Sequence, residues 1–199
     1  MNYIKLGDCA DISTGLVLKR KEASRTDKKK YPYKTITLRS LEQDGWLNEE
    51  YFDKFKSSEK LEDRYLTQIG DVIIRLSAPY TAIAIQNSQV GLVIPSLCAI
   101  IRNSSSEIIS GYLAFLLNSD IMKKEYLRSS LGATIPVIRM TDLKETNVPV
   151  LPIEMQNKTI EISNLIIAEK KLYHQLLESK DIYYKEITNK IILGGKKND

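Results

Sequence analysis

The chain has 199 residues, 43% of them hydrophobic and 27% charged, and its formal net charge is +4 at pH 7. This length and composition suit one globular domain, or one domain with an appended element, that buries its own core. No stretch approaches 18 apolar residues and the first residues hold no apolar run. We therefore expect neither a membrane span nor a secretion signal, and a cytoplasmic location.

Cysteine and histidine are too few for a metal centre. The chain contains Cys9, Cys98 and a single histidine, His174, and it has no Cys-x-x-Cys pair. A structural zinc site needs about four such ligands. We therefore expect two buried free thiols and no metal or other cofactor.

The first part of the chain alternates short apolar runs with turns. Ile, Val, Leu and Thr dominate runs that Gly, Pro, Asn or Ser mostly bound, a pattern typical of strands. The predicted strands are 34–41, 70–76, 81–87, 90–96 and 98–103.

Two other stretches have helical periodicity. Apolar residues recur at helical spacing across 107–130, where Ser110 is a candidate N-cap. A much longer amphipathic pattern occupies the C-terminal part of the chain. The expected fold class is therefore α+β, with a mixed α/β domain over 1–151, one long helix over 152–193 and a frayed tail over 194–199.

The long helix carries an apolar seam typical of a coiled coil. Its members recur at steps of three and four if polar Glu169 and Ser179 are accepted at two seam positions. The chain has no second long helix, so we expect the seam to form an antiparallel coiled coil with a helix of a partner, most simply a second copy. The predicted seam residues are Ile162, Leu165, Leu172, Leu176, Tyr183, Ile187 and Ile191.

Prolines mark the passage from the domain to this helix. Pro149 is expected to end a short helical turn, because the residue before a proline disfavours helix. Pro152 suits the first position of the long helix, with Glu154 in its first turn. We expect this joint to fix the angle between the domain and the helix.

Known catalytic motifs are missing from the sequence. No glycine-rich phosphate loop, nucleophile elbow or Asn/Asp-Pro-Pro-aromatic motif of amino-methyltransferases occurs. Glu-x-Lys, a pattern found in nucleases, occurs at 169–171 and 178–180, but both lie on the long helix without an acidic strand partner. They are interpreted as its solvated face. We expect a protein that is not an enzyme.

Basic residues gather in one segment. Residues 16–39 contain nine Lys or Arg and two acids, a net charge of +7, so the remainder of the chain sums to −3. Tyr31 and Tyr33 are interleaved with them. A basic loop with aromatic residues is typical of contact with nucleic-acid phosphates, although a merely solvated loop would look similar. The candidate DNA contacts here are Lys19, Arg20, Lys21, Arg25, Lys28, Lys29, Lys30 and Arg39.

A second polar spot follows the predicted strand 70–76. A loop between two apolar strands usually exposes its side chains, and Arg, Ser, Thr and Tyr suit base edges or phosphates. An ordinary hairpin with polar residues is the alternative. The candidates are Arg75, Ser77, Tyr80 and Thr81, with Arg139 as a further one.

Three segments together resemble a known family. "IKLGDCADISTG" (4–15), "GDVIIRLSAPYTAIAI" (70–85) and the segment 110–162, with "GATIP" and "VPVLPIEMQ" before the long helix, look like half of a specificity (S) subunit of type I restriction-modification systems. Met155 stands where the family commonly has Glu, before Gln156. The loop after "GDV" lacks the family's usual glycines. A full S subunit is roughly twice this length, with two target recognition domains (TRDs) and two long helices.

The resemblance implies a DNA-binding specificity subunit. In that family the paired long helices hold two TRDs at a fixed spacing, methyltransferase (M) subunits supply the S-adenosylmethionine site, and restriction (R) subunits supply translocation and cleavage. The expected partners are thus double-stranded DNA, M and R subunits, and a second copy through the helix seam. The alternative is a truncated S-like protein–protein module that docks a methyltransferase and modulates it without reading DNA.

Overall fold

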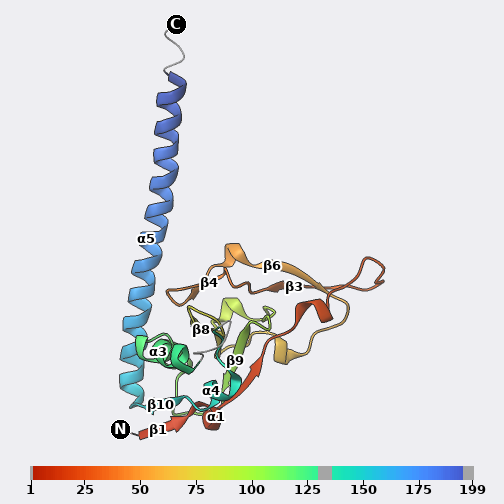
Figure 1. The fold of residues 1–199 in the computed structure, drawn as a ribbon, viewed down its shortest axis with the longest axis vertical. Coiled ribbons are helices and arrows are strands. Elements are labelled where there is room, and N and C mark those ends of the chain that lie inside the picture. Colours follow the sequence, from red (N-terminus) through yellow and green to blue (C-terminus); the bar gives the residue numbers. More distant parts are fainter. Residues whose placement is uncertain (1, 130–135, 195–199) are drawn as a thin grey trace. The chain divides into compact units, whose positions relative to one another are not determined.

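The computed structural model describes residues 2–129 and 136–194. The chain divides into two compact units, Met1–Glu161 and Ile162–Asp199, which we call unit 1 and unit 2 (Figure 1). Unit 1 contains all the strands described and the shorter helices. Unit 2 consists of the greater part of one long helix.

A four-stranded antiparallel sheet forms the centre of unit 1. Its strands follow the order β2 (Ala10–Thr14), β9 (Cys98–Asn103), β7 (Asp71–Arg75) and β8 (Ala82–Ala84). Every neighbouring pair is antiparallel, and β7 pairs with both β8 and β9. The predicted strands 70–76, 81–87 and 98–103 are confirmed in position, with β8 shorter than expected.

Both faces of this sheet are buried. On β7, Val72 and Ile74 face one apolar cluster and Ile73 faces another. On β9, Ile101 and Ile100 divide between the same two clusters. A strand buried on both faces has no polar alternation, and this explains why both strands appear in the sequence as continuous apolar runs.

Short helices and a strand pair cover one face of the sheet. Their side chains, including Leu113, Leu117 and Leu143, complete the larger apolar cluster. The elements are β1 (Asn2–Lys5) paired with β10 (Asn147–Val150), and the helices α1 (Leu6–Cys9), α2 (Ser110–Leu117), α3 (Asp120–Ser129) and α4 (Met140–Lys144).

The helical spacing expected across 107–130 is confirmed, and it belongs to two helices, α2 and α3. The first helix ends after Leu117, where the Asn118 amide accepts a hydrogen bond from Ala82 N at 2.9 Å and donates one to Ala82 O at 2.7 Å. The N-cap assigned to Ser110 is wrong. Ser110 is the first residue of α2, and its hydroxyl donates to Gly70 O at 2.5 Å.

The short pair β4 (Leu41–Glu42) and β5 (Trp46–Leu47) packs on the opposite face, where Leu41 and Leu47 join the cluster of Ile73. A further pair, β3 (Tyr31–Thr35) with β6 (Asp53–Ser57), contributes Phe55 to a third, smaller apolar cluster that also contains Val93. The strand predicted over 34–41 therefore ends at Thr35. Single-turn 3-10 helices connect these elements: η1 (Leu18–Arg20), η2 (Glu49–Tyr51), η3 (Asp63–Tyr65) and η4 (Asn87–Gln89).

The strand predicted over 90–96 is also wrong. Its backbone groups bond to several separate partners instead of one neighbouring strand. Ile36 N donates to Val93 O, Leu16 N donates to Ile94 O, and Ile94 N donates to Tyr65 O, at distances between 2.7 and 3.0 Å. Isolated bridges result in place of a ladder.

The long helix α5 (Ile153–Gly194) begins inside unit 1. Pro152 lies just before the helix, not at its first position, and its carbonyl accepts from Met155 N and Gln156 N. Gln156 is fully buried. Its amide oxygen accepts from Ile109 N at 2.9 Å, and its nitrogen donates to Glu107 O at 2.6 Å and Leu151 O at 2.8 Å. This glutamine joins the first turn of α5 to the segment before α2.

The rest of α5 forms unit 2, and its apolar side chains are exposed. The predicted seam residues between Ile162 and Ile191 keep from 37% to 71% of their surface exposed. The helix continues through Gly194, and the tail predicted to fray lies otherwise outside the described residues. No helix in the described ranges has the length and apolar character needed to cross a membrane.

Candidate nucleic-acid interface

The basic segment lies on an exposed turn and loop before β3. Lys19 and Arg20 end the 3-10 helix η1, and Arg25 and Lys28 to Lys30 occupy the loop that follows it. Short polar contacts shape this loop, since Ser24 N donates to the Asp27 carboxylate at 2.6 Å. The structure therefore places most of these cations in solvent, which phosphate contact requires.

Some of the predicted cations already have partners. Lys21 forms an ion pair with Glu59, which raises the pKa of its ammonium group. The Arg39 guanidinium lies 3.8 Å from the centre of the Tyr51 ring, a cation–π contact that orients the planar group. The Lys29 ammonium lies 5.1 Å from the Tyr31 ring centre. Of the two tyrosines noted in the sequence, Tyr31 thus contacts a basic side chain, whereas the Tyr33 hydroxyl accepts a hydrogen bond from Leu61 N at 3.0 Å.

A groove of about 540 Å³ lies beside this basic segment. Arg20 and Lys21 line one part of it, and Arg64 with Tyr65 from η3 line another. Gly15 also lines the groove. The backbone of Pro95 lies so close to Gly15 that an added Cβ would be 2.3 Å from the Pro95 carbonyl oxygen, so a larger residue would not fit there. The groove therefore has cations contributed by two separate segments, and Arg64 was not predicted from the sequence.

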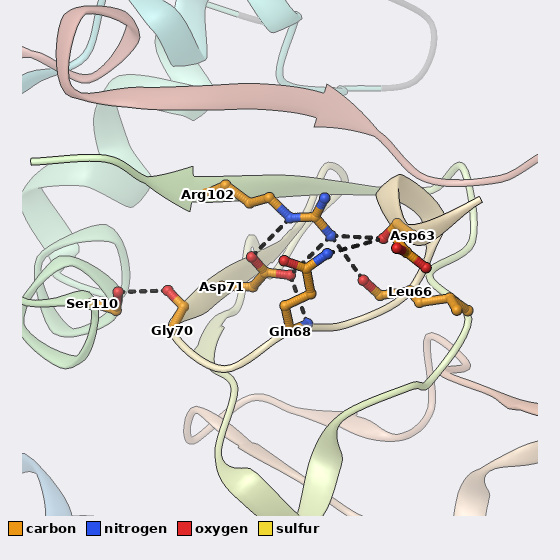
Figure 2. Close-up of polar contacts among 7 residues, drawn as sticks. All are labelled: Asp63, Leu66, Gln68, Gly70, Asp71, Arg102 and Ser110. Carbon is orange, nitrogen blue, oxygen red and sulfur yellow. Dashed lines mark hydrogen bonds and ion pairs between the residues drawn. The ribbon is translucent and has the colours of Figure 1, made fainter.

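A polar cluster around Arg102 holds the segment that carries Arg64 (Figure 2). The Arg102 guanidinium on β9 bonds to the Asp71 carboxylate at 3.1 Å, to Leu66 O at 2.8 Å and to Asp63 O at 2.9 Å. Asp71 also accepts from Gln68 N at 2.9 Å. The ion pair fixes the Arg102 guanidinium on the sheet, and its bonds to Asp63 O and Leu66 O hold the η3 segment against the sheet.

The "GD" pair of the sequence has a structural role in this cluster. Gly70 has a φ of +83°, a conformation that favours glycine, and its carbonyl accepts from Ser110 (Figure 2). The Asp71 side chain is only 3% exposed. Gly70 and Asp71 therefore make internal contacts, and neither is among the residues that line the groove.

The loop after β7 is less exposed than predicted. Arg75 is half-buried and donates to the Ser77 hydroxyl at 3.1 Å, so these two residues form one polar unit near the surface. Tyr80 is 3% exposed and Thr81 is fully buried, so the expectation that this loop exposes their side chains to DNA is wrong. The Tyr80 ring packs edge-on against Tyr126 at 6.0 Å within the core.

Arg139 is exposed but paired locally. It precedes α4, and its guanidinium makes two bonds to the Asp142 carboxylate, at 2.9 and 3.1 Å. The bidentate pair occupies the planar donors that a phosphate or a guanine would need. Arg139 is therefore a weaker candidate than the basic loop.

The residues considered for other chemistry lie apart from this surface. Cys9 and Cys98 are buried free thiols, as expected. Over residues 2–129 and 136–194, no group of His, Cys, Asp and Glu could hold a metal ion. The two Glu-x-Lys patterns lie on exposed turns of α5.

Comparison with solved structures identifies the fold. Over 96% of this chain, the HsdS subunit from Thermoanaerobacter tengcongensis matches with a TM-score of 0.58 and 15% identity. A chain from a structure describing assembly and conformational transition of the type I R-M system matches with a TM-score of 0.57 and 14% identity, also over 96%. The type I restriction-modification S subunit from M. genitalium matches over 93% with a TM-score of 0.54 and 18% identity.

This fold defines the class: it is that of the S, or HsdS, subunits of type I systems. The chain covers between 44% and 47% of the length of these three solved chains. The family described as "Type I restriction modification DNA specificity domain" matches residues 1–178. The chain belongs to that family, which confirms the resemblance of its motifs. No curated protein sequence matches it.

Proposed function

We propose that this chain is a sequence-specific DNA-recognition half of a type I restriction-modification specificity subunit, without catalytic activity of its own. One observation carries the proposal: a domain of the DNA specificity family presents an exposed basic loop, residues 19–30, beside a groove to which Arg64 adds a further cation. Sequence-independent phosphate contacts of this kind position a protein on DNA, while nearby polar groups read the bases.

The basic loop supplies the phosphate contacts in this proposal. Lys28, Lys29 and Lys30 are exposed and follow one another, so substituting all three by Gln removes three charges from one place. We expect weaker binding to every duplex, and a plot of log affinity against log salt that is flatter by about 0.9 per lost phosphate contact. Fluorescence anisotropy at several salt concentrations measures the slope, and an unchanged slope contradicts the assignment.

Arg75 and Ser77 are the proposed base-reading pair. The hydroxyl of Ser77 fixes the direction of the Arg75 guanidinium, which suits bidentate contact with a guanine. We expect Arg75→Lys to change the sequence preference in a random-oligonucleotide selection, because lysine lacks the planar fork. A uniform loss of affinity over all sequences would instead place Arg75 on the phosphates.

The exposed seam of α5 is the proposed pairing surface. In the proposed assembly, a partner helix packs antiparallel on the seam and fixes the spacing between two recognition domains. A second copy of this chain would supply that helix, and the pair would read two identical half-sites in inverted orientation. Methyltransferase and restriction subunits would then act at the site.

Methylation mapping tests the whole proposal. The full chain is co-expressed with the M subunits of its own system, and methylated sites are mapped across the host DNA. A bipartite palindrome supports the symmetric pair, and an asymmetric bipartite site supports pairing with a different S half. Methylation without any sequence preference would refute recognition by this chain and favour a module that only docks the methyltransferase.

A further inference from the structure

The outward face of the β3–β6 ribbon carries an unusual charge pattern. Lys34 on β3 stands directly opposite Lys54 on β6, and Lys56 stands opposite Pro32. All three lysines are exposed, whereas Phe55 between them is buried in a small apolar cluster with Val93. The three ammonium groups therefore project from one face of the ribbon.

This pattern is unfavourable for the ribbon itself. Directly opposed residues of an antiparallel pair have Cβ atoms roughly 5 Å apart, and like charges at such positions are destabilising. Over the described parts of the chain, none of Lys34, Lys54 and Lys56 has a carboxylate within ion-pair distance. A bound anion would relieve the repulsion that the folded chain leaves in place.

The ribbon is continuous with the basic loop. Ala23 N donates to Lys56 O at 2.8 Å, and Ser58 N donates to Lys21 O at 2.9 Å, so the start of the loop pairs with the free edge of β6. The end of the loop leads directly into β3 at Tyr31. Loop and ribbon thus form one basic surface, on the side of the sheet away from α1 and α4 (Figure 1).

We propose that Lys34, Lys54 and Lys56 form a second phosphate-contact surface, which binds the DNA backbone next to the segment held by the basic loop. This inference rests on the proposed function, because it extends the same interface. Lysine is a flexible point charge that binds phosphate without the planar fork by which arginine recognises a guanine. The ribbon therefore adds affinity and register to DNA binding, and the choice of sequence belongs to other residues.

The first test replaces the three ribbon lysines by Gln in the full chain. The probe is a fluorescent random-sequence duplex, and binding is measured across a salt series together with the sequence preference of the wild-type chain. Counterion release predicts about a fivefold loss of affinity per phosphate contact near 0.15 M salt, and a slope lower by about 0.9 for each. The preferred sequence in a selection is expected to stay the same.

The matched control removes the same charge elsewhere. Lys123, Lys124 and Lys144 lie on α3 and α4, which pack against the other face of the sheet. Their replacement by Gln is expected to leave the salt slope unchanged. An equal loss of affinity in both triple variants, or no loss in the ribbon variant, overturns the inference. The proposed function still stands in either case if the wild-type chain binds the duplex. If the wild-type chain binds no duplex, the inference and the proposed function are both overturned.

Lys34→Glu separates binding from folding. A carboxylate opposite Lys54 replaces repulsion with attraction, so the thermal midpoint is expected to hold or rise. Affinity for the duplex is expected to fall further than in Lys34→Gln, because the new charge repels phosphate. A purely structural role for Lys34 would move stability and binding in the same direction, and that result also overturns the inference.

Discussion

Unit 1 buries its apolar side chains within itself, and unit 2 leaves them in solvent. In unit 1, Val72, Ile73 and Ile74 are fully buried although they are consecutive, because both faces of the sheet are covered. In unit 2, Leu172 and Leu176 keep 65% and 51% of their surface exposed. The first unit therefore contains the partners for its own core, and the second leaves an apolar seam exposed, which is the surface proposed above for pairing.

The two units also differ in how their polar groups are used. In unit 1, buried polar side chains form hydrogen bonds to other segments. Asp71 bonds to Arg102, and Gln156 bonds to three backbone groups. The polar contacts of unit 2 are local, as in the bond from the Ser179 hydroxyl to Gln175 O one turn earlier. Most helical stability in proteins comes from packing of an amphipathic face, and a pairing of α5 as proposed above would supply that packing for unit 2.

The largest expected effect comes from charging the seam. Replacing Leu172 and Leu176 by Glu removes about 1.5–3 kcal/mol of burial per leucine in each helix of a pair. We expect loss of association at micromolar concentration, and a fall in helix content because the freed helix frays. Analytical ultracentrifugation and circular dichroism measure the two effects.

The control for the seam adds the same charge to the other side of α5. His174 and Thr188 lie about half a turn from Leu172 by the helical period, so His174→Glu with Thr188→Glu should leave association intact. Equal dissociation in both variants would mean that charge, not the seam, governs assembly. A wild-type chain that is monomeric alone and with its M subunits would contradict the pairing surface altogether.

Removal of the Arg102 guanidinium is expected to have the next largest effect, now on unit 1. Arg102→Met leaves the buried Asp71 carboxylate without its cation and frees two backbone carbonyls. We expect a loss of about 3 kcal/mol in the free energy of unfolding, at the lower end for such pairs because the Arg102 side chain keeps 26% exposure. Urea unfolding followed by tryptophan fluorescence measures it.

The same variant also tests how the groove is built. Because Arg102 holds the turn after η3, its loss should increase protease cleavage near Arg64 before unit 1 unfolds. Arg64→Gln is the matched comparison, since Arg64 is exposed and its removal should change stability little. If Arg102→Met leaves cleavage near Arg64 unchanged, the turn is held by other contacts.

A smaller loss of stability is expected from substitution of Gln156, which lies in the first turn of α5 and bonds to the segment before α2. Gln156→Leu leaves one amide and two carbonyls of the backbone without partners in a buried place. We expect a loss of about 2 kcal/mol in the free energy of unfolding of unit 1, which urea titration measures. The neighbouring Asn157 is exposed, so Asn157→Leu is expected to lower the free energy of unfolding far less. Equal losses in both variants would show that the amide bonds contribute nothing specific.

The sequence predicts the parts of the fold whose signals are local. The apolar runs around Ile73 and Ile100 became β7 and β9, and the long helical period became α5. The basic loop is likewise visible, because its cations are consecutive in the chain. The strand expected over 90–96 is wrong because the contacts of this segment are not local. The backbone of Val93 and Ile94 is satisfied by partners far along the chain, which no local pattern shows.

The candidate site likewise contains features with local sequence signals and features that depend on distant contacts. Arg64 joins the groove through contacts with distant segments, because Arg102 bonds to Asp63 O and Leu66 O on either side of it and Ile94 N bonds to Tyr65 O. Tyr80 and Thr81 have residue types suited to DNA, but the fold turns them into the core, where Tyr80 meets Tyr126. Burial of this kind depends on contacts between distant segments. Two local signals point to the ribbon lysines: Lys34 lies in the basic segment 16–39, and Lys54 and Lys56 alternate around the apolar Phe55.

The smallest expected effect concerns the buried thiol of Cys98, which only unit 1 can provide. Burial raises the pKa of Cys98 from 9.0 to about 12. Above pH 9 the unfolded chain releases this proton and the folded chain keeps it, so stability falls as pH rises from 9 towards 12. Cys98→Ala removes this dependence. The stability advantage of wild type over the variant should therefore narrow by about 1.4 kcal/mol between pH 8 and pH 10 in urea titrations.

Ile100→Val is the control, because it deletes a methyl group on the same face of β9 without removing a titrating group. The difference in free energy of unfolding between this variant and wild type should not vary with pH. A constant difference for Cys98→Ala as well would mean that solvent reaches the thiol, and that the closed two-faced core which distinguishes unit 1 from the exposed helix opens at β9.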